Sequence, residues 1–278
     1  MDLINLGSKT ARNGFQNEQD VVDIFNSWQT SPLAQEWLKK MNYKISEIEN
    51  VKAVLLNKII PKPKSDVNLQ VKISWKNGEI DIQNLSVKLV SNKNGFNQID
   101  KRRTEKYTEM WNIPDEITQI LKHFSGEIPP KIKNPKDPRR MFANEFTSNE
   151  QKTLLNFLQQ NRILIVSDIL RGRGDFSADW MLVVVKKSKE IENWALEEIG
   201  LVMNFFGSGD IEITKRGSIK IGRITLQRKG GDGGRDTANM LQFKIDPSKL
   251  CDLRKSKNLD NIFTNNLRNP SPHKHQMI

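Results

Sequence analysis

Two stretches of alternating apolar and polar residues stand out in the first third of the chain. Val67–Trp75 (VNLQVKISW) and Glu79–Val90 (EIDIQNLSVKLV) have the period of two that is typical of strands, and Lys76-Asn77-Gly78 joins them. Asn-Gly is a strong signal for a tight hairpin turn. The pattern therefore predicts a β-hairpin over residues 67–90.

Longer periods predict helices elsewhere. Apolar stripes at helical spacing predict helices over 15–28, 100–124 and 191–206, the last with Gly207 as its C′ residue. Thr147-Ser-Asn-Glu150 is a capping box and predicts a further helix start. The remaining apolar runs predict strands, and these runs are RILIVSDIL (162–170), DWMLVVVKK (179–187), DIEIT (210–214), SIKIGRITLQ (218–227) and NMLQFKIDP (239–247).

The chain also carries a candidate boundary. Residues 126–140 hold four of its 11 prolines, which marks a stiff connector. We predict a first part over 1–125, a second part over 126–250 that packs closely on it, and a flexible extension over 251–278, where the tail has little apolar content.

Composition narrows the chemistry. The 278 residues include one cysteine and three histidines, and only His123 lies outside the tail. A multi-cysteine zinc site, a Cys-His nucleophile pair and a His-based metal nuclease all lack the necessary parts. No signal peptide or membrane-length apolar run is visible, so we expect a soluble intracellular protein.

Positive charge is concentrated in one window. The chain has a formal net charge of +11, and residues 215–244, with eight cations and two acids, contribute +6. A local cationic surface is typical of polyanion binding, which indicates a nucleic-acid partner. An edge sheet protected by charge is the alternative explanation.

The predicted hairpin offers a phosphodiester-cleaving site. Such chemistry without His or Cys usually uses a divalent cation held by carboxylates, with a lysine beside the attacking water. Asp66 opens the first strand, and Ser86 and Lys88 share one face of the second. Val87 points into the core and offers its carbonyl to the metal. A snorkelling lysine is the alternative for Lys88.

Three other acids complicate this assignment. Asp232 with Lys244 repeats the spacing, and Asp175 with Lys186 is a poorer version. Asp232 lies in the flexible loop GGDGGR, which favours contact with phosphates or base edges over catalysis. Glu18 falls on the apolar stripe of the first helix, where a carboxylate is costly unless it is paired or binds a cation; an edge position that reaches water is the alternative.

Polar clusters supply the candidate DNA contacts. Side chains of the glycine-rich region suit guanine, cytosine and adenine edges in the major groove. A second cluster follows Lys88 directly, and RGRGD is a phosphate-binding candidate of lower specificity. The predicted contacts are Gln227, Arg228, Lys229, Asp232, Arg235, Asn239 and Gln242, then Lys93, Asn97 and Gln98, then Arg171 and Arg173. Ligand-free polar loops and an Asx-rich turn are the alternatives.

Longer blocks carry a family resemblance. GSKTARNGFQNEQD, SDVNLQV…VKLVSNKNGFNQIDK, DILRGRGDF and GSGDIEITKRGSIKIGRITLQRKGGDGGRDTANMLQFKIDP together resemble the HinP-type restriction endonuclease that cuts GCGC, over about residues 1–250. The resemblance implies a type II enzyme of the PD-(D/E)xK superfamily, Mg²⁺ as cofactor and double-stranded DNA as partner. It also implies an α/β fold, with a mixed central sheet flanked by helices and a second β-rich DNA-recognition subdomain, here 1–125 and 126–250.

The resemblance also implies roles. Asp66 is expected to bind the metal, Lys88 to be the catalytic lysine and Glu18 to be the helix acid near the metal. Ser86 departs from the family's Gln or Glu, and the interval from Asp66 to Lys88 is one residue longer than in the relative. Glu18, Glu79 or Asp81, or a water bridged from Ser86, would then supply the missing oxygen.

The expected reaction is in-line attack of water, positioned and deprotonated by Mg²⁺ and Lys88, which leaves a 5′-phosphate. By analogy alone, a partner methyltransferase and a bacterial cytoplasmic location are expected. Other functions stay open at this stage, namely a non-catalytic DNA-binding protein, an RNA nuclease and a nonspecific repair nuclease.

Overall fold

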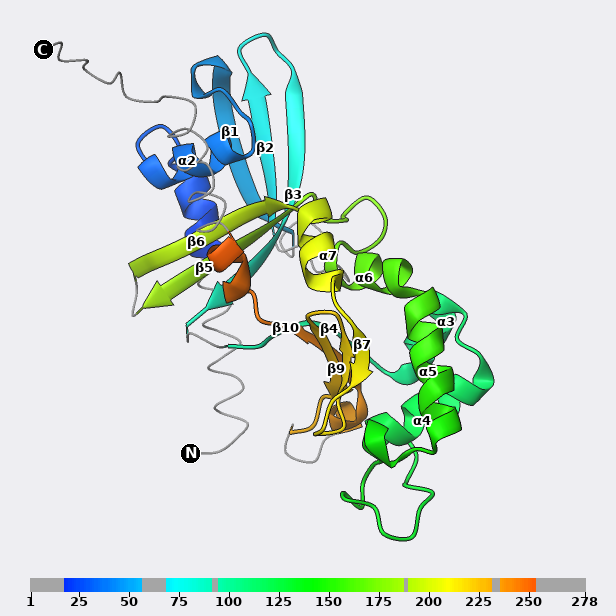
Figure 1. Ribbon diagram of the computed structural model, residues 1–278. Helices are drawn as coiled ribbons and strands as arrows, with labels where there is room; N and C mark the ends of the chain where they lie inside the picture. The colour runs from blue at the N-terminus through cyan, green and yellow to red at the C-terminus, as the bar shows by residue number, and fades with distance from the viewer. Residues whose placement is uncertain (1–17, 57–68, 92–94, 188–189, 232–235, 254–278) are drawn as a thin grey trace, which may run out of the picture.

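The computed structural model describes residues 18–56, 69–91, 95–187, 190–231 and 236–253. It contains two five-stranded sheets, which we call sheet A and sheet B (Figure 1). Sheet A has the order β1-β2-β3-β5-β6, and its strands are β1 (Ile48–Leu55), β2 (Leu69–Trp75), β3 (Ile80–Val90), β5 (Trp180–Lys187) and β6 (Glu190–Glu198). Sheet B has the order β4-β10-β9-β8-β7, and its strands are β4 (Asn97–Arg102), β10 (Leu241–Ile245), β9 (Ile224–Arg228), β8 (Ile219–Ile221) and β7 (Ile211–Ile213).

Helices cover both faces of sheet A. Residues 18–26 are helical and, with α2, pack on one face, in a core around Phe25, Trp37 and Leu182. The helices of the middle of the chain share a second core with the opposite face of sheet A and one face of sheet B. The helices are α2 (Pro32–Lys40), α3 (Thr104–Trp111), α4 (Asp115–Ser125), α5 (Ser148–Gln160), α6 (Arg162–Leu170) and α7 (Ile199–Gly207), with 3-10 turns at Ile45–Glu47, Ala143–Glu145 and Asp236–Asn239. The mixed α/β class predicted above is confirmed.

Strand pairing makes sheet A mixed. β2 and β3 form the predicted antiparallel hairpin, with Leu69 opposite Leu85 and Gly78 in the turn at φ +91°. From Leu85 to Val90, β3 pairs in parallel with β5, so that Lys88 lies beside Val183. β3 therefore belongs to the hairpin in its first half and to the buried centre of the sheet in its second half.

The strand predicted over RILIVSDIL is wrong, because these residues form helix α6. Ile165, Val166, Ile169 and Leu170 are buried, at the spacing of one helical face, while Ile163 is 83% exposed. A short apolar run fits a buried strand and a buried helix equally well, so the pattern alone did not decide between them.

Two predicted helices begin too early. Residues 190–198 form strand β6, and the helix starts only at Ile199, because pairing with β5 fixes the first half as a strand. Residues 97–102 form strand β4, and α3 and α4 are separated by a left-handed Asn112. Gly207 is the last residue of α7 and not a C′ residue; a Cβ there would lie 3.2 Å from a Val166 methyl, so the glycine permits close helix packing.

Three further predictions have different outcomes. The capping box is present, with Thr147 Oγ1 accepting from Glu150 N and Glu150 Oε2 accepting from Thr147 N. Sheets A and B each take strands from both sides of residues 126–140, so the division at 126 is no sheet boundary and stays a prediction about function. Cys251, the first residue of the predicted extension, is buried in the core, while residues 254–278 lie outside the described residues.

Candidate active site and nucleic-acid interface

The second half of β3 carries the predicted catalytic residues. Val87 and Leu89 face the core that includes α2, whereas Val90 faces the core shared with sheet B. Ser86 and Lys88 therefore point to the Val90 side, as the alternation predicts. Ser86 has no exposed surface, and its Oγ has no hydrogen-bond partner within the described part of the chain. A buried hydroxyl oxygen without a partner is costly, and it marks this strand end as unusual.

An ion pair places Glu18 at the same edge of sheet A. Asp20 Oδ2 accepts from Lys186 Nζ at 2.5 Å. Lys186 follows Val185, which pairs with Val90 at the carboxyl end of β3. The start of the first described helix, with Glu18 two residues before Asp20, is thus held near the end of β3. The competing pair of Asp175 and Lys186 lies at opposite ends of β5, because Asp175 precedes this strand and Lys186 is near its end. Lys186 is also engaged by Asp20.

Asp66 lies outside the described residues. It precedes Leu69 by three residues, which span at most about 11 Å of extended chain. Leu69 pairs with Leu85, from which β3 continues to Ser86 and Lys88. The role of Asp66 therefore stays a prediction.

Two of the acids considered for the missing ligand are too distant. Glu79 accepts from Asn77 Nδ2 in the hairpin turn, and Asp81 accepts from Tyr43 OH at 2.5 Å. Burial and this contact with Asp81 raise the pKa of Tyr43. Asp81 and Lys88 are seven positions apart on β3, which corresponds to about 23 Å along the strand. Of the three candidates, Glu18 is the one that lies near the carboxyl end of β3.

The donors at this edge suit a hard divalent cation. Glu18 offers a carboxylate, Val87 a carbonyl and Ser86 a buried hydroxyl with an unused oxygen, and oxygen atoms are the ligands that Mg²⁺ prefers. No three His, Cys, Asp or Glu side chains come together among the described residues, of which Asp66 is not one. The residues present therefore fit a metal site that Asp66 would complete.

Sheet B has one apolar and one polar face. Its apolar face, with Phe243, Leu226 and Ile219, lies in the shared core. On the other face, residues that are paired between neighbouring strands form a row across the sheet, and this row is Gln98, Lys244, Thr225, Lys220 and Glu212. A second row on the same face holds Lys101, Gln242 and Gln227. We call these two rows the polar face of sheet B.

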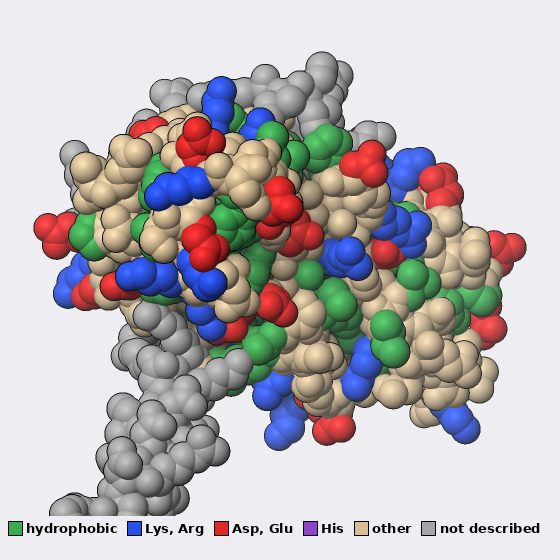
Figure 2. Space-filling model, turned by 90° about the horizontal axis from the view of Figure 1, so that it is seen from above, with side chains coloured by type: hydrophobic (Ala, Val, Ile, Leu, Met, Phe, Trp, Pro, Cys, Tyr) green, Lys and Arg blue, Asp and Glu red, His purple; other side chains and the backbone are tan. Residues whose placement is uncertain are grey.

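Contacts within the polar face join its strands. Gln242 Nε2 donates to Gln98 Oε1 at 2.8 Å, and Lys220 Nζ donates to Thr225 Oγ1 at 2.7 Å. Burial lowers the pKa of Lys220, which also lies 5.7 Å from the ring centroid of Phe96. The one acid in the two rows, Glu212, belongs to the edge strand. The surface at the hairpin end of the molecule has a different distribution of charge, because Lys and Arg lie among Asp and Glu there (Figure 2).

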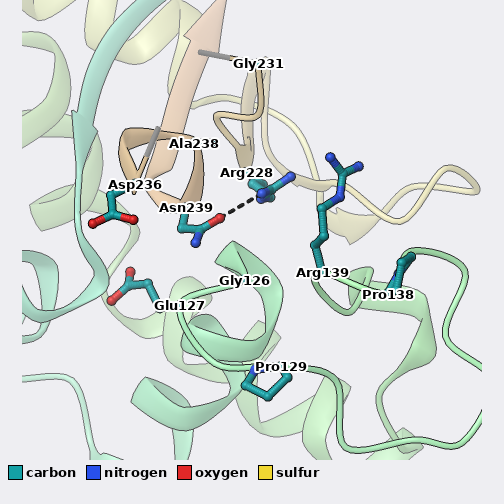
Figure 3. A pocket seen from close by; sticks show the side chains of 10 residues that line it. All are labelled: Gly126, Glu127, Pro129, Pro138, Arg139, Arg228, Gly231, Asp236, Ala238 and Asn239. Atoms are coloured by element: carbon teal, nitrogen blue, oxygen red, sulfur yellow. Dashed lines mark hydrogen bonds between the residues drawn. The ribbon is translucent and has the colours of Figure 1, made fainter. Parts of the chain in front are cut away.

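The structure divides the residues predicted as one DNA-reading group. Gln227 lies on the polar face, whereas its neighbour Arg228 points to the opposite side, where its Nε donates to Ser125 O at 2.9 Å. Arg228 Nη2 also donates to Asn239 Oδ1 at 2.7 Å (Figure 3). The alternation of a strand separates them, which adjacency in sequence hid. Lys220 and Lys244 lie in the predicted cationic window but were not among the predicted contacts, and Lys101 lies outside that window; the register pairs place all three on the polar face.

The remaining candidates have different outcomes. Arg173 Nε donates to Asp168 Oδ1 at 2.8 Å and its Nη2 to Met110 O, so Arg173 ties its loop to α3 and α6. Arg171 is exposed at the end of α6, and Asn97 is half-buried at the start of β4. Lys93, Asp232 and Arg235 lie outside the described residues.

Comparison with known proteins defines the class. The crystal structure of restriction endonuclease MspI in complex with its cognate DNA matches with a TM-score of 0.60 and 17% identity, over 88% of this chain and 93% of that chain. The fold is therefore that of a restriction endonuclease. No curated protein sequence matches the chain.

The sequence defines the family. The family model described as R.HinP1I restriction endonuclease matches residues 41–251, and the chain belongs to this family. It is a type II restriction endonuclease, which sets aside a non-catalytic DNA-binding protein. Such enzymes generally use a divalent metal ion. No helix in the described part of the chain is long and apolar enough to cross a bilayer.

Proposed function

We propose that this enzyme hydrolyses double-stranded DNA at GCGC, depends on Mg²⁺ and leaves 5′-phosphates. The observation that carries the proposal is the short chain connection between two polar regions. The polar end of β3 leads, after residues 91–96, into β4, the first strand of the polar face of sheet B. A duplex that lies on this cationic face has a phosphate within reach of Lys88.

The residues at the end of β3 divide the work. Asp66, Glu18 and the Val87 carbonyl would hold the cation, which polarises the scissile phosphate and offsets its developing charge when bound. Lys88 orients the attacking water and favours loss of its proton. Its ammonium group also stabilises the anionic phosphorus centre, because the buried surroundings of β3 strengthen the interaction.

The polar face supplies recognition. Gln98 and Gln227 present amides, the buried Gln242 donates to Gln98, and Lys101, Lys220 and Lys244 present ammonium groups. Lysine matches guanine O6 and N7, the acceptors that a G/C sequence displays in the major groove. Asp232, in the loop after β9, would accept from cytosine N4. We also propose a bacterial cytoplasmic setting and a methyltransferase that protects the same sequence, both from the class alone.

Digestion of a sequenced plasmid tests the proposal. With Mg²⁺, we expect discrete fragments whose sequenced ends all fall at GCGC and carry 5′-phosphates that a ligase joins. Fragments that end at another sequence would refute the specificity. A smear would instead indicate a nonspecific nuclease, and an intact plasmid at every magnesium concentration would refute the catalytic assignment.

A further inference from the structure

A pocket lies at the rim of sheet B, where β9 ends. Its volume is about 390 Å³, and it is lined by Gly126, Glu127, Pro129, Pro138, Arg139, Arg228, Gly231, Asp236, Ala238 and Asn239. Figure 3 shows the side chains of Arg139 and Arg228 on one side of this pocket and those of Glu127 and Asp236 on the other. The two kinds of charge are therefore separated across it.

Cations are in excess on the arginine side. Arg139 and Arg140 both contact Asp137, and Arg228 contacts neutral groups only. Burial, together with the nearby guanidinium groups, lowers the pKa of Arg140 and of Arg228. Arg140 Nε is buried without a hydrogen-bond partner among the described residues. Two of these three guanidinium groups thus share the Asp137 carboxylate, and Arg228 has no carboxylate contact among the described residues, an arrangement that an anion would stabilise.

The acids of the other side are engaged elsewhere. Glu127 Oε1 accepts from Thr104 N at 2.8 Å and from Thr104 Oγ1 at 2.7 Å. Asp236 lies 3.8 Å from Arg103. Neither carboxylate is therefore the partner of Arg139 or Arg228, and both repel an anion toward the arginine side.

The pocket lies across the end of β9 from the polar face. Gln227 and Arg228 are neighbours on β9, one on the polar face and one in the pocket. Gly126, at φ +84°, lets the backbone after α4 approach this rim, since a Cβ there would lie 2.6 Å from Arg139 O and 3.3 Å from Arg228 Nε. A duplex that lies on the polar face and continues past the end of β9 brings its backbone to this rim.

We infer that Arg139 and Arg228 bind a DNA phosphate outside the recognised bases. This inference rests on the proposed function, because it needs a duplex on the polar face. Guanidinium groups suit phosphate by their planar, forked donors, and such a contact adds affinity without sequence information.

The test compares two duplexes that contain GCGC, in Ca²⁺ to prevent cleavage. One is about 10 base pairs long and ends near the recognised bases, and the other is about 30 base pairs long. For Arg139→Gln we expect roughly fivefold to tenfold weaker binding of the long duplex, a salt slope lower by about one, and little change with the short duplex. Arg139 is chosen because it is exposed, whereas Arg228 holds Ser125 and Asn239 in place.

Two further variants guard against a merely structural effect. Lys133→Gln removes a charge from the same segment outside the pocket lining and should change neither affinity. Asp137→Asn removes the carboxylate that occupies Arg139, through bonds of 2.9 and 3.0 Å, and should strengthen binding of the long duplex. Loosening of the loop would instead weaken binding in both the Arg139 and the Asp137 variants.

The outcomes separate this inference from the proposed function. If the wild type binds neither duplex, the proposed function fails. If the wild type binds both but Arg139→Gln affects them equally or not at all, the phosphate site is wrong. Weaker binding of the long duplex by Asp137→Asn would also overturn the inference.

Discussion

The end of β3 and the polar face of sheet B carry polar residues under opposite conditions. Both faces of β3 are covered there, so a polar side chain such as fully buried Ser86 is an exception. Sheet B packs one face in the shared core, and polar residues on its other face are expected. On a covered strand, the mere presence of a polar group indicates function. On the polar face of sheet B, only the kind of polar group is informative. Here the groups are lysines and amides, with a single acid on the edge strand.

The largest effect should come from Lys88, which distinguishes the chemical region from the binding region. Lys88→Ala should lower the single-turnover cleavage rate by roughly 1000-fold, about 4 kcal/mol of transition-state stabilisation. Affinity for a GCGC duplex should change only a few fold. Rapid-quench cleavage and a binding titration measure the two quantities, and equal losses in both would erase the distinction.

Gly126 tests whether the turn after α4 packs closely against Arg139 and against Arg228 at the end of β9. Gly126→Ala forces a side chain into a left-handed residue and against Arg139 O, which should cost about 2–4 kcal/mol of unfolding free energy. Gly172→Ala is the matched control, with φ +81° but no atom within 4 Å of the added Cβ, and should cost about 1 kcal/mol. Urea unfolding of both variants measures the difference, and equal losses would contradict the close approach.

Substitutions on the polar face should weaken the binding of duplex DNA. Lys220→Gln combined with Lys244→Gln should weaken duplex binding by about 10- to 30-fold and lower the salt slope by about two. Cleavage at saturating protein should fall far less than for Lys88→Ala. An unchanged salt slope in a fluorescence titration would show that DNA lies elsewhere.

Ser86 should give the smallest effect. Ser86→Ala removes a buried hydroxyl without a described partner, so unfolding free energy should stay the same or rise by up to about 1 kcal/mol. Cleavage should fall by about tenfold if this oxygen serves the site directly or through water. A clear loss of stability would instead mean that the hydroxyl has a structural partner.

Local signals predicted the hairpin and the capping box because each depends on residues close in sequence. The errors at α6 and β6 arose where tertiary pairing, absent from a local pattern, selected between two structures. For β6, the partner β5 decided; for α6, burial of one helical face decided. The alternation within β3 placed Ser86 and Lys88 correctly because the strand itself was correct.

The recognition surface was harder to predict. Grouping Gln227 with Arg228 followed sequence adjacency, and the strand sends them to opposite sides. Arg139 was not among the predicted contacts, because it lies 89 positions before Arg228 in the sequence. Only the folded chain, with its turn at Gly126, brings the two arginines together. Long-range register and loop packing, which no local pattern encodes, define these sites.

The most direct test of the central claim is a magnesium titration of single-turnover cleavage by two aspartate variants. Asp66→Ala should abolish cleavage at every Mg²⁺ concentration while the protein still binds GCGC duplex. Asp232→Ala should keep the wild-type dependence on Mg²⁺ and change the sequence preference. Cleavage by Asp66→Ala near the wild-type rate, or a lost metal response in Asp232→Ala, would contradict a metal site at the end of β3.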